Sequence, residues 1–389
     1  MRIGFDAKRA YHNTTGLGHY SRTLIRSLVQ YYPQHRYLLF NPRRSGRFHF
    51  SDLSQVEEVL PAGFPASLLP GWWRSSGMTR DLRKREVGLY HGLSHELPLG
   101  IGRTGIPSVV TMHDLIFELY PQQYKPADRL IYRRKFQYAC RQATRIIAIS
   151  KQTGADLVRL YGVDPAKIDV CYQGCNPAFS VPVAPEEKLR VKQLYGLPDR
   201  FFLYVGSIIE RKNLLNLCRA LPLLPPEAAL PLVIIGGGGV YKQRVLDYLR
   251  QARLEQRCIF LSDSPAARQH PGFLTAADFP AIYQQAAALV YPSFYEGFGI
   301  PVLEGLSSGI PVITSHQSCL PEAGGEGAFY ADPSDPASIA AQLHHVLADP
   351  ETVARHHILT QQHLQRFTPQ ATTEAVMAAY HKTLQEAGC

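Results

Sequence analysis

Tyr291-Pro-Ser-Phe-Tyr-Glu-Gly-Phe-Gly-Ile-Pro-Val-Leu-Glu-Gly-Leu-Ser-Ser-Gly-Ile-Pro-Val-Ile-Thr314 is the stretch that says most about the fold. The apolar run that ends at Pro292 has the length of a buried strand, and a Gly-Phe-Gly turn follows it. Pro301 suits the first position of a helix, because the N–H that proline lacks has no partner there. The stretch therefore predicts a strand, a loop and a helix start, the repeating unit of parallel α/β sheets.

Two glutamates in this stretch are candidates for ligand binding. Glu296 falls in the predicted loop and Glu304 in the predicted first helical turn, so the two carboxylates should bind different groups. Gly297 and Gly299 would let the backbone approach a ligand, and the N–H groups at a helix N-terminus attract phosphate. The alternative is a plain strand-to-helix connection in which Glu304 is only a first-turn charge that favours the helix dipole.

A second cluster follows the apolar run 201–205. Gly206 ends this predicted strand, and Arg211 and Lys212 stand before a leucine-rich helix. A guanidinium fork beside an ammonium suits a diphosphate, whereas two solvated cations at a helix N-terminus would oppose its dipole. The glycines at 236–239 follow another predicted strand, and without an acidic partner at the usual offset they are interpreted as structural.

The first half of the chain offers weaker candidates. Gly16 and Gly18 open a helical pattern, where they either approach a ligand or only make the turn. His113 and Asp114 end a predicted strand. A histidine there is either a satisfied packing residue or a group that binds a substrate hydroxyl and shares charge in the transition state.

Strand-like runs alternate with helical patterns along the whole chain, which predicts two doubly wound α/β domains. A proline- and glycine-rich segment after residue 173 interrupts the pattern, and we expect the hinge at 178–187. The predicted domains are 1–180 and 181–369, with a final helix at 370–389, and ligands should bind in a cleft between them. The expected strands are 2–6, 36–41, 107–112, 145–149, 168–172, 201–205, 231–235, 258–261, 288–292 and 310–314.

In this order, the motifs resemble those of the retaining GT-B glycosyltransferases of family 4, and Glu296 and Glu304 match that family's EX7E motif. The resemblance covers nearly the whole chain, including Ile149-Ser150, and is nearest to bacterial mannosyltransferases. It implies two Rossmann-like domains facing across a deep cleft, with helix 370–389 crossing back to the N-terminal domain. The segment 262–273 departs from the family's pattern near its base site, so the resemblance leaves the base open. His113-Asp-Leu and the first strand resemble those of bacterial mannosyltransferases, which favours GDP-mannose over a UDP-sugar.

The resemblance also implies roles for the candidate residues. Arg211 and Lys212 would hold the donor diphosphate, Glu296 would grip the donor sugar, Glu304 would bind the ribose, and His113 would lie beside the sugar. The remaining donor-binding residues that it implies are Gly16, Gly18, Gly206, Phe298, Gly299 and Leu303. We expect transfer of a hexosyl group with retention of configuration, and no cofactor or metal.

The distribution of charge along the chain indicates which kinds of binding partner to expect. The charge is uneven, with 25 Lys and Arg against 13 Asp and Glu over residues 1–185, a balance of +12. Tryptophans and leucines in Pro65–Arg85 beside this charge, together with the cations of 125–145, favour an anionic membrane surface and a glycan or lipid-linked oligosaccharide acceptor. We expect a cytoplasmic protein, peripheral on the inner face of the membrane, in cell-surface polysaccharide or lipopolysaccharide synthesis.

Other functions fit fewer of these features. A basic nucleic-acid- or lipid-binding protein would not need Glu296, Glu304 and the Arg-Lys pair together, and we expect no nucleic-acid partner. A sugar-nucleotide epimerase or phosphorylase of the same fold remains an alternative, whereas a nicotinamide oxidoreductase would need a glycine fingerprint nearer the first strand. The seven scattered cysteines fit a reducing compartment, and Cys171 and Cys175 lack the second ligand pair of a zinc site.

Overall fold

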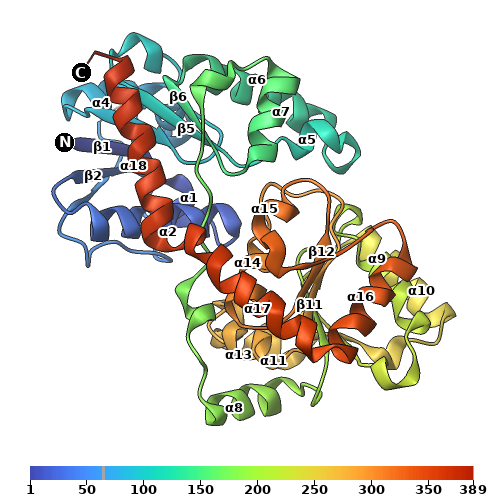
Figure 1. Cartoon of the computed structure of the whole chain (residues 1–389). Helices are drawn as coiled ribbons and strands as arrows, with labels where there is room; N and C mark the ends of the chain where they lie inside the picture. Colours follow the sequence, from blue (N-terminus) through green and yellow to red (C-terminus); the bar gives the residue numbers. More distant parts are fainter. Residues whose placement is uncertain (64–65, 389) are drawn as a thin grey trace. The chain divides into compact units, whose positions relative to one another are not determined.

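A computed structural model describes residues 1–63 and 66–388, so that Phe64, Pro65 and Cys389 lie outside the described part. The chain divides into two compact units. Unit 1 comprises Met1–Gln173 and Thr368–Cys389, and unit 2 comprises Gly174–Phe367. Each unit is built on its own parallel sheet, and Figure 1 shows the elements of both.

Unit 1 contains a seven-stranded sheet in the order β3-β2-β1-β4-β5-β6-β7, and every neighbouring pair is parallel. This is the strand order of a Rossmann fold with one strand added. The strands are β1 (Arg2–Asp6), β2 (Arg36–Phe40), β3 (Val56–Val59), β4 (Leu89–Gly92), β5 (Ser108–Met112), β6 (Arg145–Ala148) and β7 (Ile168–Val170). The α-helices are α1 (Lys8–His12), α2 (Gly16–Tyr31), α3 (Pro70–Trp72), α4 (Met78–Lys84), α5 (Ile116–Leu119), α6 (Pro126–Gln142), α7 (Lys151–Tyr161) and α18 (Pro369–Glu386).

Unit 2 contains a six-stranded parallel sheet in the order β10-β9-β8-β11-β12-β13, again the order of a Rossmann fold. Its strands are β8 (Phe202–Val205), β9 (Leu232–Ile235), β10 (Cys258–Phe260), β11 (Ala288–Tyr291), β12 (Val312–Ser315) and β13 (Phe329–Ala331). Its α-helices are α8 (Pro185–Tyr195), α9 (Leu214–Ala220), α10 (Val240–Gln251), α11 (Pro265–Gln269), α12 (Pro271–Leu274), α13 (Phe279–Tyr283), α14 (Ile300–Ser307), α15 (Leu320–Gly324), α16 (Pro336–Ala348) and α17 (Pro350–Leu364).

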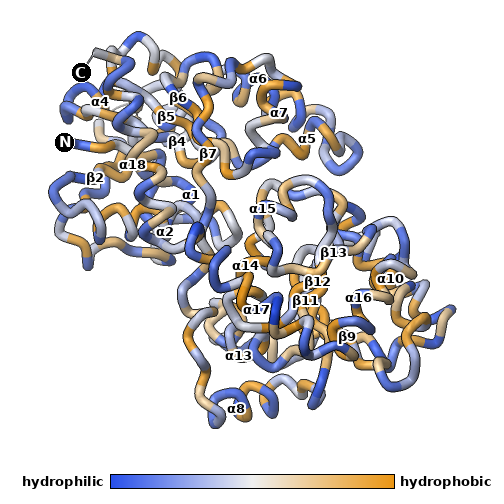
Figure 2. The backbone as a smooth tube through the Cα atoms, in the orientation of Figure 1, coloured by the Kyte–Doolittle hydropathy of each residue, from blue (hydrophilic) through white to orange (hydrophobic). Residues whose placement is uncertain are grey.

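All ten expected strands are present, with ends that differ from the expected ones by at most two residues, and three further strands complete the sheets. β3, β4 and β13 were not expected from the sequence. β3 reads Val-Glu-Glu-Val at the edge of its sheet, so its apolar run is too short to stand out. β4 contains a histidine and a glycine although all four of its residues are buried. In Figure 2 the strands β9, β11 and β12 run through the apolar, orange centre of unit 2.

The final helix belongs to unit 1, as the resemblance implied. α18 lies along α2 in Figure 1 and adds Val376, Met377 and Tyr380 to the core of the sheet. The Tyr380 hydroxyl lies 2.6 Å from Nδ1 of His91 on β4. The buried face of α18 is formed by positions 373, 376, 377, 379, 380 and 383.

The contacts divide the chain between Gln173 and Gly174, a few residues before the expected boundary at 180. The short segment after Gly174 packs on unit 2, since the Phe179 ring lies 4.9 Å from that of Tyr283. The Gln284 amide also donates to the carbonyl of Val181 over 2.8 Å. These contacts place the start of unit 2 upstream of α8.

Candidate active site

Two loops of unit 2 meet where the strand order of its sheet reverses. β8 and β11 are neighbours in the sheet although β9 and β10 lie between them in the sequence. Ligands of open α/β sheets bind at the carboxyl ends of strands at such a switch point. Arg211 and Lys212 follow β8 and Glu296 follows β11, so that the topology brings the two motifs to one place.

The three charged side chains form one cluster. Nη1 of Arg211 lies 2.7 Å from Oε2 of Glu296, and Nζ of Lys212 lies 3.0 Å from Oε1 of the same carboxylate. Tyr291, the last residue of β11, donates its hydroxyl hydrogen bond to Oε1 of Glu296 over 2.8 Å. Arg211, Glu296 and Tyr291 are buried, with Glu296 only 8% exposed.

The cluster has a strong effect on the acidity of Glu296. Burial alone would raise the pKa of this carboxyl group, but the positive charges of Lys212 and Arg211 lower the pKa to about 2. Glu296 is therefore ionised at neutral pH. It supplies an anionic partner within the protein for the two cations, which the sequence assigned only to a ligand diphosphate.

The backbone on both sides of the cluster is held by hydrogen bonds. The Glu296 N–H donates to Oγ of Ser318 over 3.1 Å, and the Cys319 thiol lies within 3.0 Å of the carbonyl oxygen of Glu296. On the other loop, Asn213 has a left-handed backbone (φ 61°), and its amide donates to the carbonyls of Pro292 and Pro333. The loops after β8 and β11 are thus tied to each other.

Glu304 lies in a different environment. It is the fifth residue of α14, past the first turn, because the helix begins at Ile300 and Pro301 takes its second position. The interpretation of Glu304 as a first-turn charge is therefore wrong. Burial raises its pKa to about 7, opposed by the hydrogen bond that Tyr283 donates to Oε2 over 2.8 Å. The two glutamates thus differ in charge near neutral pH, consistent with different ligands.

The glycines after β8 and β9 serve close backbone packing. Gly206 has φ +152°, and a Cβ added there would lie 3.1 Å from Cδ of Lys212. A Cβ on Gly236 would lie 1.9 Å from the carbonyl oxygen of Gly206, and one on Gly238 would lie 2.5 Å from that of Ile208. The glycines of 236–239 therefore let their backbone pack directly against the loop after β8, in agreement with their interpretation as structural residues.

The remaining predicted donor-binding residues of unit 2 surround the start of α14. Gly299 has φ +118°, a conformation that favours glycine, and immediately precedes the helix. The side chains of Phe298 and Leu303 are buried.

His113 lies in unit 1, at the carboxyl end of β5. Its Nε2 lies 2.9 Å from the carbonyl oxygen of Leu93, and its Nδ1 lies 3.1 Å from the Gln173 amide nitrogen. Burial, with a smaller contribution from His95, lowers the pKa of His113 to about 3. The ring is therefore neutral near pH 7, and both of its nitrogens contact protein groups. These contacts agree with the interpretation of His113 as a packing residue. A neutral ring is not expected to share positive charge in the transition state.

The two glycines of α2 differ in their surroundings. A Cβ on Gly18 would lie 1.9 Å from the carbonyl oxygen of Asn13, so this glycine is needed for the turn. A Cβ on Gly16 would meet nothing within 4 Å. The turn interpretation therefore accounts for Gly18 and leaves Gly16 as the candidate for ligand contact.

Sequence reasoning did not single out the two tyrosines that hydrogen-bond the glutamates. Tyr291 stands in the quoted stretch, but a strand tyrosine is usually a core residue. Within the described residues, no group of three or more His, Cys, Asp or Glu side chains is placed to hold a metal ion. No helix in the described part of the chain is long and apolar enough to span a membrane.

Comparison with known proteins identifies the family. The family model described as "Glycosyl transferases group 1" matches residues 185–358, and "Glycosyltransferase Family 4" matches residues 14–179. The O-antigen chain mannosyltransferase B of Escherichia coli is 30% identical over 367 residues, covering 90% of this chain and 91% of that protein. The chain is a family 4 glycosyltransferase. The resemblance drawn from the EX7E motif is thereby confirmed at the level of the family.

Further relatives and solved structures agree with this assignment. The O-antigen chain mannosyltransferase RfbU of Salmonella typhimurium is 24% identical over 67% of this family 4 chain and 65% of its own. The crystal structure of Anabaena Alr3699/HepE in complex with UDP and glucose has a TM-score of 0.72 at 18% identity, covering 98% of this chain and all of that one. Sucrose-phosphate synthase from Thermosynechococcus elongatus has a TM-score of 0.70 at 20% identity, with 98% of each chain covered. These structures confirm the GT-B fold with two Rossmann-like domains.

Proposed function

We propose that this glycosyltransferase moves a mannosyl group from GDP-mannose to a hydroxyl of a lipid-linked oligosaccharide, with retention of the anomeric configuration. The observation that carries the proposal is the cluster of Arg211, Lys212 and Glu296 at the switch point of unit 2. Cations there match the charge of a donor diphosphate, and a carboxylate beside them matches sugar hydroxyl donors.

The proposed catalytic effect is electrostatic. As the bond between sugar and phosphate breaks, negative charge accumulates on the departing diphosphate, and cations already held in place stabilise it more in the transition state than in the ground state. Glu296 keeps the Arg211 and Lys212 side chains together before the donor arrives. In this proposal the Glu296 carboxylate accepts hydrogen bonds from the donor sugar, while a phosphate oxygen of the leaving group takes the acceptor proton.

Glu304 is proposed to bind the donor ribose. An ionised carboxylate accepts hydrogen bonds from a pair of hydroxyl groups, whereas a protonated one accepts fewer. Tyr283 acts as a positioning residue, because its hydroxyl donates to Oε2 of Glu304. The pKa near 7 makes this contact sensitive to pH in the neutral range.

The choice of sugar and base rests on the relatives. The two curated relatives described above carry mannosyltransferase names tied to the O-antigen, which supports mannose and a role in cell-surface polysaccharide synthesis. A UDP-sugar is the second candidate, because the HepE crystal structure is a complex with UDP and glucose.

A donor screen tests the proposal. Purified enzyme is incubated with GDP-mannose, UDP-glucose, UDP-galactose and ADP-glucose, and release of the nucleoside diphosphate is measured with and without a lipid-linked oligosaccharide extract. Of the four donors, we expect only GDP-mannose to release its nucleoside diphosphate, and the extract should accelerate this release. NMR of the glycosylated product should show that the transferred sugar keeps the α configuration it has in the donor. Activity with a UDP-sugar only would replace the donor proposal, and an inverted product would exclude retention.

Metal independence is tested separately. The positive charge of Arg211 and Lys212 is proposed to take the place of a divalent cation at the diphosphate. We expect turnover after treatment with EDTA to equal that in added Mg²⁺ or Mn²⁺. Loss of turnover with EDTA, restored by one of the metals, would contradict this expectation.

The proposal places the enzyme in the cytoplasm at the inner face of the membrane. Trp72, Leu68 and Leu69 are exposed near the basic residues of unit 1, as a membrane interface requires. Trp73, the other tryptophan expected at the membrane surface, is instead buried and donates its indole N–H to Asp81. Flotation with phosphatidylglycerol vesicles should carry the protein upward, and phosphatidylcholine vesicles should not; failure to float with either would exclude the membrane contact.

A further inference from the structure

Tyr291 connects two of the three charged side chains at the switch point of unit 2. Its hydroxyl accepts a hydrogen bond from Nζ of Lys212 over 2.5 Å and donates one to Oε1 of Glu296 over 2.8 Å. Nζ of Lys212 also lies 4.8 Å from the centre of the Tyr291 ring, within the range of a cation–π contact. One tyrosine therefore holds both the ammonium and the carboxylate.

The direction of these two hydrogen bonds is fixed. An ammonium can only donate, so the oxygen of Tyr291 accepts from Lys212 and its own proton points to Glu296. Burial, together with the negative charge of Glu296, raises the pKa of Tyr291 well above its ordinary value. The hydroxyl therefore keeps its proton in the neutral range. Hydrogen bonds that run in one direction along such a chain strengthen one another.

The loop after β8 confines the rest of the Lys212 side chain. A Cβ added at Gly206 would lie 3.1 Å from Cδ of Lys212 and 3.3 Å from its Nζ. Because glycine leaves this space free, the lysine side chain lies against the backbone of Gly206, while Tyr291 and Glu296 fix its end. The ammonium is thus ordered before a ligand arrives, which reduces the entropy lost on binding.

The contacts of Glu296 are divided unevenly between its two oxygens. Oε1 accepts from the Tyr291 hydroxyl and lies 3.0 Å from Nζ of Lys212. Oε2 lies 2.7 Å from Nη1 of Arg211. A carboxylate oxygen accepts about two hydrogen bonds. Among the described residues Oε1 therefore has both of its partners, and Oε2 is the oxygen with room for a hydroxyl of the donor sugar.

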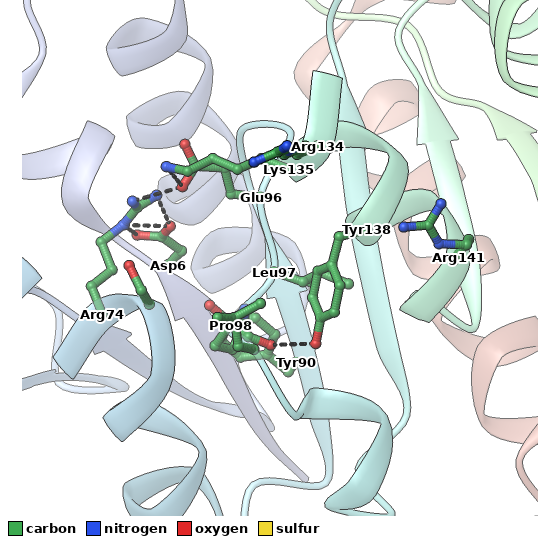
Figure 3. A pocket seen from close by; sticks show the side chains of 12 residues that line it. Asp6, Arg74, Tyr90, Glu96, Leu97, Pro98, Arg134, Lys135, Tyr138 and Arg141 are labelled. Atoms are coloured by element: carbon green, nitrogen blue, oxygen red, sulfur yellow. Dashed lines mark hydrogen bonds and ion pairs between the residues drawn. The ribbon is translucent and has the colours of Figure 1, made fainter. Parts of the chain in front are cut away.

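A strand tyrosine beside buried charges does not always contact them. In unit 1, Figure 3 shows Arg74 paired with Asp6, and Tyr90 of β4 lines the same cavity. Both oxygens of Asp6 accept from the Arg74 guanidinium, whereas the Tyr90 hydroxyl lies 3.4 Å from Sδ of Met78. The contacts of Tyr291 therefore do not follow simply from burial next to an ion pair.

We propose that Tyr291 is a positioning residue for the glycosyl transfer. Its hydroxyl holds the Lys212 ammonium in place for the donor diphosphate, and it occupies Oε1 of Glu296 so that Oε2 accepts from the sugar. This inference rests on the proposed function, because it states how that site is ordered. The hydroxyl acts through its two neighbours and needs no contact of its own with the donor.

The variant Tyr291→Phe keeps the ring over the ammonium and removes only the hydroxyl. Isothermal titration calorimetry with inorganic pyrophosphate measures the effect on Lys212 without turnover and without a sugar. We expect Tyr291→Phe to weaken pyrophosphate binding about tenfold. In a Lys212→Ala background it should have no further effect, because the hydroxyl acts on pyrophosphate only through the lysine. With GDP-mannose, kcat of Tyr291→Phe should fall about tenfold, measured well below the melting temperature.

Tyr330→Phe is the matched control, because it removes a tyrosine hydroxyl of unit 2 that donates to the carbonyl of Gly325 over 2.6 Å. It should bind pyrophosphate as wild type does, even if its melting temperature is lower. Unchanged affinity in Tyr291→Phe would overturn the inference. An equal loss in the control, or the same loss in the Lys212→Ala background, would overturn it as well.

The two readouts separate this inference from the proposed function. If Tyr291→Phe weakens pyrophosphate binding as expected but wild type hydrolyses no sugar nucleotide, the proposed function fails and the ordering of Lys212 by Tyr291 stands. If wild type and Tyr291→Phe turn over GDP-mannose equally, the positioning role fails and the proposed function stands.

Discussion

The guanidinium of Arg211 and the carboxylate of Glu296 form a buried ion pair, 2.7 Å between Nη1 and Oε2, across the switch point of the second sheet. The charges that the proposed mechanism needs for the donor are therefore already paired with each other. A donor diphosphate must share Arg211 with Glu296, so that the carboxylate both orders the cation and competes for it.

Arg211→Ala should reduce turnover about 100- to 1000-fold, as expected when one preorganised donor to a developing charge is lost. It should also lower the melting temperature, because Glu296 stays buried with one cation fewer. Steady-state kinetics and thermal unfolding measure the two effects. Arg219→Ala is the control, since Arg219 is an exposed arginine of unit 2 that donates a hydrogen bond to Asn216.

A double-mutant cycle separates the two effects of Arg211→Ala. Adding Glu296→Gln removes the uncompensated charge, so the double variant should be about 1–3 kcal/mol more stable than the sum of the single changes implies. Its turnover should stay as low as that of Arg211→Ala. Wild-type turnover in a folded Arg211→Ala enzyme would refute the role of this side chain.

The Michaelis constant for the donor should rise as the pH falls below about 7. The pKa of Glu304 is raised to about 7, so acid protonates the carboxylate proposed to bind the ribose. Glu304→Gln should raise this constant at every pH and remove its pH dependence. Tyr283→Phe removes the hydrogen bond that partly lowers the pKa of Glu304, so the pH dependence of the Michaelis constant should move to higher pH. An unchanged pH dependence would contradict the positioning role of Tyr283.

The two glutamates should affect the pH dependence of the free energy of unfolding in opposite directions. The folded pKa of Glu296 is about 2, below the ordinary value of 4.5, so its contribution is present above pH 4.5 and is lost as the pH falls towards 2. The loss should amount to about 3 kcal/mol. Chemical unfolding of wild type and Glu296→Gln between pH 2 and 5 measures the difference, which should shrink towards the acid end.

For Glu304 the sign is reversed. Its folded pKa exceeds the ordinary value of 4.5, so its favourable contribution is complete below pH 4.5 and is lost as the pH rises through about 7. Glu304→Gln should therefore unfold at a higher temperature than wild type at pH 8. A stabilising effect that is larger at pH 5 than at pH 8 would contradict the assignment.

Gly236→Ala should destabilise the protein by at least about 2 kcal/mol, because its Cβ would lie 1.9 Å from the carbonyl oxygen of Gly206. Gly237→Ala is the matched control in the same loop, where an added Cβ meets nothing within 4 Å. Thermal unfolding compares the two variants. Equal melting temperatures would show that the packing between these two loops does not require glycine at position 236.

The sequence predicts the sheets well because their central strands are continuous apolar runs. β8 and β9 are buried on both faces and contain only aliphatic and aromatic residues. The edge strand β3 is interrupted by two glutamates and β13 is only three residues long, and both were missed. Their assignment depends on pairing with a neighbouring strand, which a single sequence does not show.

Part of the candidate site could be predicted because its residues follow strands that are recognisable as apolar runs. Arg211, Lys212 and Glu296 each follow a recognisable strand, and the parallel topology brings such positions together. What could not be predicted is that the three charges pair with one another, or that Tyr291 adds a hydrogen bond. His113 shows the reverse case, since its strand-end position suggested a ligand contact while its ring nitrogens bind Leu93 and Gln173.

The placement of α18 has a consequence for biosynthesis. Tyr380 and Met377 complete the core of unit 1, yet the ribosome adds them after the whole of unit 2. Unit 2 is one continuous segment, so it has every residue of its own sheet while the end of the chain is still being made. Unit 1 must wait with an unfilled apolar face until the last helix emerges from the exit tunnel, which makes this nascent domain a natural client for chaperones.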